Sequence, residues 1–207
     1  MNDPSKPCLV DTGQGFSVLY HNRHLYSKYA PSRAPVAAMA DLHILPESLI
    51  LCFSPLLGYG LPELLSSLPA TCFVIGIEAD PDILDFTRKH LPEIVMNDPR
   101  FILSDISCVQ DLVEWFETSC PVQPRRCIAI DCSGAASLYT RLYRTMISTL
   151  DSIIATWWKN RMTLMVLGRN YHRNILRNLH VIPRSLQLTS CRSSRPVLVA
   201  GAGPSLD

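Results

Sequence analysis

The sequence has 207 residues, of which 47% are hydrophobic, 8% aromatic and 18% charged, values typical of a globular protein with one sizeable core. The start, MNDPSKPCLV, lacks the apolar core of a secretory signal, so we expect no signal of this kind. The most apolar stretch, residues 48–60, contains Pro55, Gly58 and Gly60 and is shorter than the about 20 residues of a spanning helix. We therefore expect a soluble, cytoplasmic protein without membrane contact.

The formal net charge of +1 hides a division along the chain. Met1–Asp151 contains 11 Lys/Arg and 17 Asp/Glu, giving −6, whereas Ser152–Asp207 contains 8 Lys/Arg and one acidic residue, giving +7. Such asymmetry is typical of a chain that binds an anionic ligand or nucleic acid, and equally of a basic section that packs on the protein's own acidic domain.

The eight cysteines do not form a metal or disulfide pattern. No CxxC pair is present, and no pair of histidines has the spacing of a zinc site, so we expect no metal. Four of the cysteines lie in or beside apolar runs, where a reduced thiol packs as a small hydrophobic group: Cys52, Cys72, Cys127 and Cys132.

The first predicted element is a β-hairpin within an N-terminal segment of residues 1–40. GFSVLY (15–20) and HLYSKY (24–29) flank a turn in which Asn22 suits a positive φ. A short helix in APVAAMADL (34–42) follows Pro31.

Four continuous apolar runs follow, and a helical pattern comes after each of them. They are SLILCF (48–53), CFVIGIE (72–78), RFILSD (100–105) and RCIAID (126–131). Strands without polar alternation, each separated by a helix, predict a parallel sheet covered by helices on both faces. We therefore expect an α/β, Rossmann-like domain over residues 41–135, with N-caps at Asp80 and Ser107 for two of its helices.

A long helical segment is predicted over residues 136–180. Its apolar residues recur at spacings of three or four, and Gly168 is expected to bend or end the first helix before a second one, RNYHRNILRNL (169–179). Residues 181–207 would form a polar linker and the first strand and loop of another domain, PVLVAGAGPSLD (196–207).

Ligands of parallel α/β sheets bind beyond the carboxyl ends of the strands. There, Gly58 and Gly60 form a loop that lets backbone approach a ligand, and acidic residues follow the expected strands at Glu78, Asp80, Asp105 and Asp131. The set Gly58, Gly60, Glu78 and Asp80 resembles the cofactor loop of S-adenosylmethionine-dependent methyltransferases, although the same acids are common helix caps.

Two further candidate sites lie in the basic section. VAGAGPSLD (199–207) is a glycine-rich loop directly after an apolar strand, a pattern suited to phosphate and equally to a simple turn. Arg169, Arg173 and Arg177 recur every four residues on one helical face, which could contact an anionic partner or simply be solvated. That face has no interleaved aromatic residues, so we do not expect nucleic acid there.

Several segments resemble, in order, the motility-associated factor family of bacterial flagellin glycosyltransferases and their relatives. They are LYSKYAPSRAP, FSPLLGYGLPELL, VIGIEADPDIL, NRMTLMVLGRNYHRNILRNL and PVLVAGAGPSLD, and together they cover nearly the whole chain. The resemblance implies an N-terminal Rossmann-like domain, followed by the opening of a central domain similar to 6-hydroxymethylpterin diphosphokinase.

In the family, that central domain transfers nonulosonic acids from cytidine-monophosphate-activated donors to flagellin. The resemblance implies that Gly201, Gly203, Pro204 and Ser205 belong to its nucleotide loop. It also implies that this chain stops before the catalytic domain, has no catalytic residue of its own, and contacts the missing domain, another subunit or flagellin. Two alternatives are a small methyltransferase-like enzyme that uses Gly58, Gly60, Glu78 and Asp80, and a basic-helix module for nucleic acid or another anionic partner.

Overall fold

The computed structural model describes residues 6–179 and Pro183. The chain divides into two compact units, Met1–Lys159 and Asn160–Asp207. The predicted linker and terminal strand, with Gly201, Gly203, Pro204 and Ser205, lie outside the described residues.

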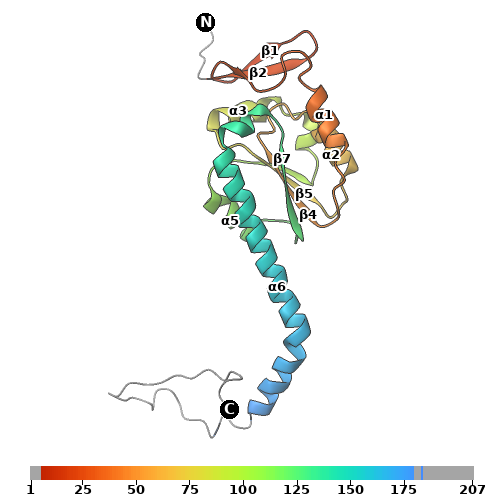
Figure 1. The fold of residues 1–207 in the computed structure, drawn as a ribbon, viewed down its shortest axis with the longest axis vertical. Helices are drawn as coiled ribbons and strands as arrows, with labels where there is room; N and C mark the ends of the chain where they lie inside the picture. Colours follow the sequence, from red (N-terminus) through yellow and green to blue (C-terminus); the bar gives the residue numbers. More distant parts are fainter. Residues whose placement is uncertain (1–5, 180–182, 184–207) are drawn as a thin grey trace, which may run out of the picture. The chain divides into compact units, whose positions relative to one another are not determined.

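A four-stranded parallel sheet forms the centre of the first unit and confirms the α/β prediction (Figure 1). Its strands are β4 (Ser48–Phe53), β5 (Phe73–Ile77), β6 (Phe101–Ser104) and β7 (Arg126–Asp131). The order is β6-β5-β4-β7, so the chain runs outward from β4 to β6 and then crosses to the other side of β4. The two directions meet between the carboxyl ends of β4 and β7, which is where such folds bind ligands.

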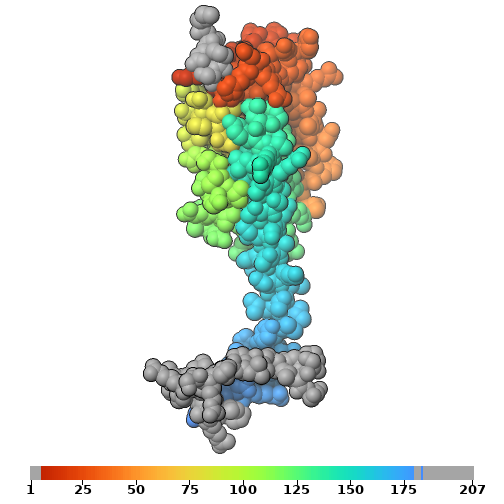
Figure 2. All heavy atoms as spheres, turned by 60° about the vertical axis from the view of Figure 1, so that its left-hand side comes forward, coloured from red at the N-terminus to blue at the C-terminus, as the bar shows by residue number. Residues whose placement is uncertain are grey.

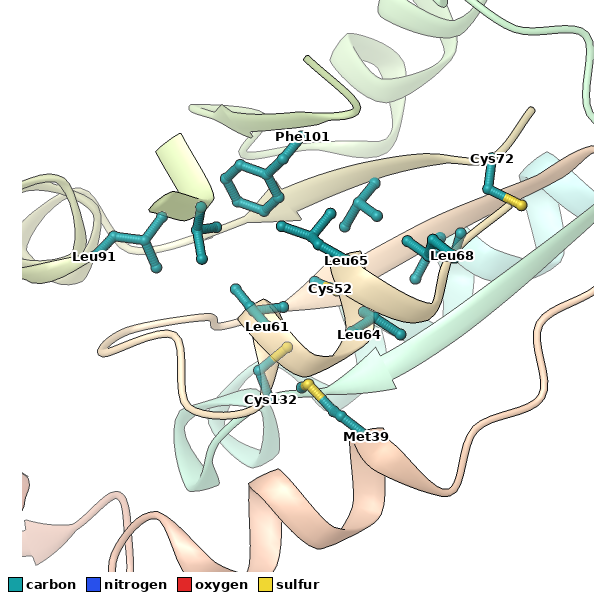
Figure 3. Packing of buried hydrophobic residues seen from close by; sticks show 13 residues of the cluster. Met39, Cys52, Leu61, Leu64, Leu65, Leu68, Cys72, Leu91, Phe101 and Cys132 are labelled. Atoms are coloured by element: carbon teal, nitrogen blue, oxygen red, sulfur yellow. The ribbon is translucent and has the colours of Figure 1, made fainter. Parts of the chain in front are cut away.

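Helices cover both faces of this sheet. Those that pack on one face are α1 (Arg33–Ala40), α2 (Leu61–Ser67) and α4 (Glu93–Met96), and those that pack on the other are α5 (Val109–Thr118) and the first part of α6 (Thr140–Leu179). Every residue of β4 is buried because successive side chains enter opposite cores. Ile50 and Cys52 pack with α2, as Figure 3 shows for Cys52, whereas Leu51 packs with α5 and α6.

The predicted N-terminal hairpin is present, but it is part of a three-stranded antiparallel sheet. The strands are β1 (Cys8–Asp11), β2 (Phe16–Tyr20) and β3 (Arg23–His24). His21 and Asn22 both have positive φ, 47° and 58°, which is the conformation of the tight turn expected there. The predicted second strand stops after His24 because Leu25 and Tyr26 turn into a buried cluster.

Two local predictions in the helices are wrong. Gly168 does not end a helix: α6 continues through it to Leu179, because a single glycine costs only about 1 kcal/mol relative to alanine. The N-cap of α5 is Cys108 rather than Ser107, since the Cys108 sulfur accepts the Asp111 N–H at 3.4 Å. Asp80 caps α3 (Pro81–His90) as predicted, accepting the N–H groups of Asp82 and Ile83.

The thiols follow the expectation from the apolar runs. Cys52, Cys72 and Cys132 are buried, Cys127 is partly buried, and the described cysteines are all free. Within residues 6–179, no helix combines the length and the apolar character needed to cross a bilayer.

Candidate functional site

The predicted cofactor residues come together at the carboxyl edge of the sheet. Gly58 and Gly60 lie in the loop between β4 and α2, whereas Glu78 and Asp80 lie between β5 and α3. The hydrogen bond from Leu56 N–H to Glu78 joins the two loops directly.

The loop after β4 is a tightly folded, buried segment. Ser54 and Leu56 are fully buried and have positive φ values of 52° and 48°, which side-chain-bearing residues adopt only rarely. Gly58 and Gly60 also have positive φ, and an added Cβ would lie 2.7 Å from Leu91 Cδ1 and 2.7 Å from Pro35 O, respectively. The two glycines therefore accommodate the packing of the chain against itself.

Glu78 is 2% exposed and occupies the position where a carboxylate would bind ribose hydroxyls. Its Oε1 accepts the Leu56 N–H at 3.1 Å and the Thr87 hydroxyl at 2.9 Å. Oε2 is buried and has no hydrogen-bond partner among the described residues. Burial raises the pKa of Glu78 to about 7, because it outweighs the opposing effect of the hydrogen bonds from the Leu56 N–H and the Thr87 hydroxyl.

Asp80 binds three separate elements through one carboxylate. Besides capping α3, its Oδ2 accepts the hydroxyls of Tyr20 (2.7 Å) from β2 and Tyr139 (2.8 Å) from the turn before α6. Partial burial raises the pKa of Asp80, whereas the hydrogen bonds from the two tyrosines and from the helix N–H groups lower it. The second effect is the larger one, so the pKa of Asp80 lies below its ordinary value. In this conformation both oxygens of Asp80 are occupied, whereas Oε2 of Glu78 has no partner among the described residues but is buried.

The N-terminal sheet covers this edge. Tyr26 is buried and its hydroxyl donates to Pro55 O at 3.1 Å, which fixes the hairpin to the loop after β4. One buried cluster combines residues of the N-terminal segment, the loop after β4, helix α3 and the region before α6: Val18, Tyr20, Leu25, Tyr26, Leu56, Leu57, Ile83, Phe86 and Ala135. In Figure 2 the red hairpin residues adjoin the yellow segment that contains α3. The space next to the predicted cofactor loop is therefore filled by the chain's own side chains.

Tyr143 is a residue of this edge that the sequence analysis missed. Its ring stacks on Phe53 at 4.1 Å, and its hydroxyl lies 3.3 Å from both Ser54 Oγ and the Ala79 N–H, which it accepts. The buried face of α6 consists of Tyr143, Met146, Leu150 and Ile154, with spacings of three, four and four. That spacing was available in the sequence and identifies Tyr143 as a core position.

The remaining strand-end acids are exposed and do not join Glu78 and Asp80. Asp131 borders a cavity of about 250 Å³ beside Phe53, Thr140 and Arg144. Asp105 borders a separate hollow along α5. No group of three or more His, Cys, Asp or Glu residues in the described part of the chain could hold a metal ion.

The three arginines predicted to form a stripe lie together on α6 and are all exposed. Arg173 donates to Asn170 Oδ1 at 3.4 Å. None of the three forms an ion pair with a described carboxylate. The stripe is therefore a basic surface whose charges are not neutralised within residues 6–179.

The fold and this edge define a Rossmann-like α/β domain in which the N-terminal segment covers the loops that follow β4 and β5. No protein-family model matches the chain. It is similar to an uncharacterized protein of Treponema pallidum (strain Nichols), with 32% identity over 212 residues. The match covers 97% of this chain but 36% of that protein, so the chain spans about a third of the length of its relative.

Proposed function

We propose that this chain is an accessory, scaffold part of a protein glycosyltransferase that resembles the motility-associated factors. Its α/β unit would not catalyse transfer, and it would contact the catalytic domain, another subunit or flagellin. The ordered resemblance of five segments supports the family. The single observation that supports the accessory role is the packing of the candidate cofactor loop, in which the Leu56 N–H donates to Glu78 and is not available to a ligand.

Three features support a structural rather than a catalytic role for this edge. Asp80 is saturated by two tyrosine hydroxyls and two helix N–H groups. The glycines of the loop leave no room for a side chain, since a Cβ at Gly58 would clash with Leu91 and one at Gly60 with Pro35 O. Ligand-binding sites are normally concave and enclose most of their ligand. At this edge the enclosed groups are side chains of the chain itself, Leu56 and Tyr26.

The test is to incubate the purified 207-residue protein with a cytidine-monophosphate-activated nonulosonic acid and flagellin. We expect no transfer of sugar, as followed by mass spectrometry of the flagellin. Transfer by this chain alone would overturn the accessory assignment. A full-length family member that glycosylates the same flagellin serves as the positive control.

The methyltransferase-like alternative makes the opposite prediction for ligand binding. S-adenosylmethionine that binds the folded chain would raise its Tm by mass action, whereas we expect no shift at millimolar concentration. A concentration-dependent rise that is lost in Glu78→Gln but kept in Glu117→Gln, an exposed glutamate on α5, would favour the alternative.

A further inference from the structure

A cavity of about 250 Å³ lies beyond the carboxyl ends of β4 and β7, where the order of the strands reverses. Asp131 is the last residue of β7 and Phe53 the last residue of β4, and the two are register partners. Because Phe53 packs toward α6, Asp131 lies on the same side of the sheet. This is the position at which parallel α/β sheets bind ligands.

The first turns of α6 form the other wall of the cavity. Thr140, Arg144 and Ile147 border it, and their spacings of four and three place them on one face of the helix. Tyr143 stacks on Phe53 with ring centroids 4.1 Å apart, which holds this part of α6 against the strand. Two alanines add further apolar surface to the lining.

Two opposite charges border this cavity without pairing. Within residues 6–179, no ion pair joins Asp131 to Arg144, and none joins either of them to another side chain. Both residues are exposed, so neither charge is removed from solvent by the fold. An acid and a base that border one cavity but stay apart are complementary to a molecule that carries both opposite charges.

The chain around Asp131 is fixed by hydrogen bonds to the neighbouring strand and its loop. The next residue, Cys132, donates its N–H to Phe53 O at 2.9 Å. The Ser133 hydroxyl donates to Ser54 O at 2.8 Å. The backbone that carries Asp131 is therefore held in place, as a preformed binding site requires.

We propose that this cavity binds a small zwitterion of the α-amino-acid class, with its ammonium group on Asp131 and its carboxylate group on Arg144. The Thr140 hydroxyl donates to Ser137 O at 3.1 Å, so its oxygen can accept a hydrogen bond from the ammonium group. The apolar part of the ligand would contact Ile147 and the two alanines.

The size of the cavity and the proposed role of the chain set the limits of this inference. Cavities for drug-sized ligands have volumes of about 300–1,000 Å³, so the cavity beside Asp131 suits a smaller molecule. The inference goes beyond the accessory role, because it gives the α/β unit a ligand of its own without any catalytic step.

Other ligand classes match only part of the site. A simple anion such as phosphate would pair with Arg144 but would be repelled by Asp131, and a metal cation would meet the reverse situation. S-adenosylmethionine has the charged groups of an amino acid, but its adenosine needs a larger space than this cavity. A small zwitterion satisfies both charges and the volume.

The test measures the Tm of the full 207-residue chain with each standard amino acid in turn at millimolar concentration. We expect at least one of them to raise the Tm in a concentration-dependent way, because it binds the folded state. The matched probes are the amine that lacks the carboxylate and the acid that lacks the ammonium group, which for L-leucine are isoamylamine and 4-methylpentanoate. Neither analogue should shift the Tm. No shift with any amino acid, or an equal shift with one analogue, would overturn the proposal.

Variants test the two charges separately. Asp131→Asn and Arg144→Gln should each weaken binding about tenfold or more, because each removes a charge-assisted hydrogen bond. Without ligand both variants should keep the wild-type Tm, since neither side chain forms an ion pair among the described residues. The matched controls are Asp151→Asn and Lys89→Gln, exposed positions outside the cavity, which should bind like the wild type. Wild-type affinity in Asp131→Asn or Arg144→Gln would contradict the proposal.

The competing ligands give distinct results. Inorganic phosphate that raises the Tm of the wild type and of Asp131→Asn but not of Arg144→Gln, without any effect of amino acids, would identify an anion site and overturn the zwitterion. Sugar transfer by the chain alone would overturn the accessory role but not the amino-acid result, so the two proposals fail separately.

Discussion

Glu78 is a residue whose protonation the fold strongly affects. Its pKa is raised to about 7 from an unfolded value near 4.5, so between these values the folded chain holds a proton that the unfolded chain has released. The bound proton stabilises the folded chain. This stabilisation has its full value below pH 4.5 and is lost as the pH rises through 7. The difference corresponds to a loss on the order of 3 kcal/mol across that window.

We expect Glu78→Gln to remove this component of the pH dependence, since the amide has no proton to lose. Urea unfolding at pH values between 5 and 8 should show the wild type losing stability relative to Glu78→Gln as pH rises. Glu117→Gln, on the exposed side of α5, should follow the wild type at every pH. A constant difference between the wild type and Glu78→Gln would show that Glu78 does not titrate differently in the folded state.

At the level of elements, Gly60 and Gly168 differ in whether the surrounding structure has room for a side chain. Gly60 is the N-cap of α2 with a φ of 84°, and a Cβ there would lie 2.7 Å from the backbone oxygen of Pro35. Gly168 lies within α6, and a Cβ there would meet no atom within 4 Å. The same substitution should therefore have opposite effects at the two positions.

We expect Gly60→Ala to lower the free energy of unfolding by about 2 kcal/mol or more, through the left-handed backbone and the steric contact with α1. Gly168→Ala should stabilise the helix locally by about 0.5–1 kcal/mol. Thermal unfolding measures the first effect, and amide hydrogen exchange of residues 164–172 measures the second. Faster exchange in Gly168→Ala would mean that α6 is interrupted there, as the sequence alone suggested.

Elements formed by local patterns were predictable, whereas contacts between distant residues were not. The runs 48–53 and 126–131 match β4 and β7, and the Asp80 cap follows from a side chain that reaches N–H groups two and three residues ahead. The candidate loop residues were also placed at the correct edge. Nothing in the sequence indicates that Glu78 binds an N–H 22 residues away, or that Tyr20 and Tyr139 share Asp80, because such pairs depend on the tertiary packing of the hairpin.

For the molecule as a whole, the shared carboxylate of Asp80 joins the N-terminal sheet to the α/β body. Tyr20 belongs to the hairpin and Tyr139 to the turn before α6, and the two hydroxyls meet on one oxygen of a residue that caps α3. Three segments that are far apart in the chain are thus held at one point, over the edge where a ligand of this fold would bind. We therefore expect the stability of the N-terminal sheet and the stability of the α/β body to be coupled.

The double variant Tyr20→Phe, Tyr139→Phe tests this coupling. Each hydroxyl donates to a charged acceptor, so each loss should cost about 1 kcal/mol in the free energy of unfolding, reduced from the usual range because Asp80 is partly exposed and water can replace the donors. Amide exchange should rise in β2 and also in the first turn of α3, although neither tyrosine lies in α3. Tyr29→Phe, at a side chain that is 83% exposed, is the matched control and should change neither measurement. If exchange rises in β2 alone, the hairpin opens independently of the body, and the covered edge would then be accessible to a ligand without unfolding of the sheet.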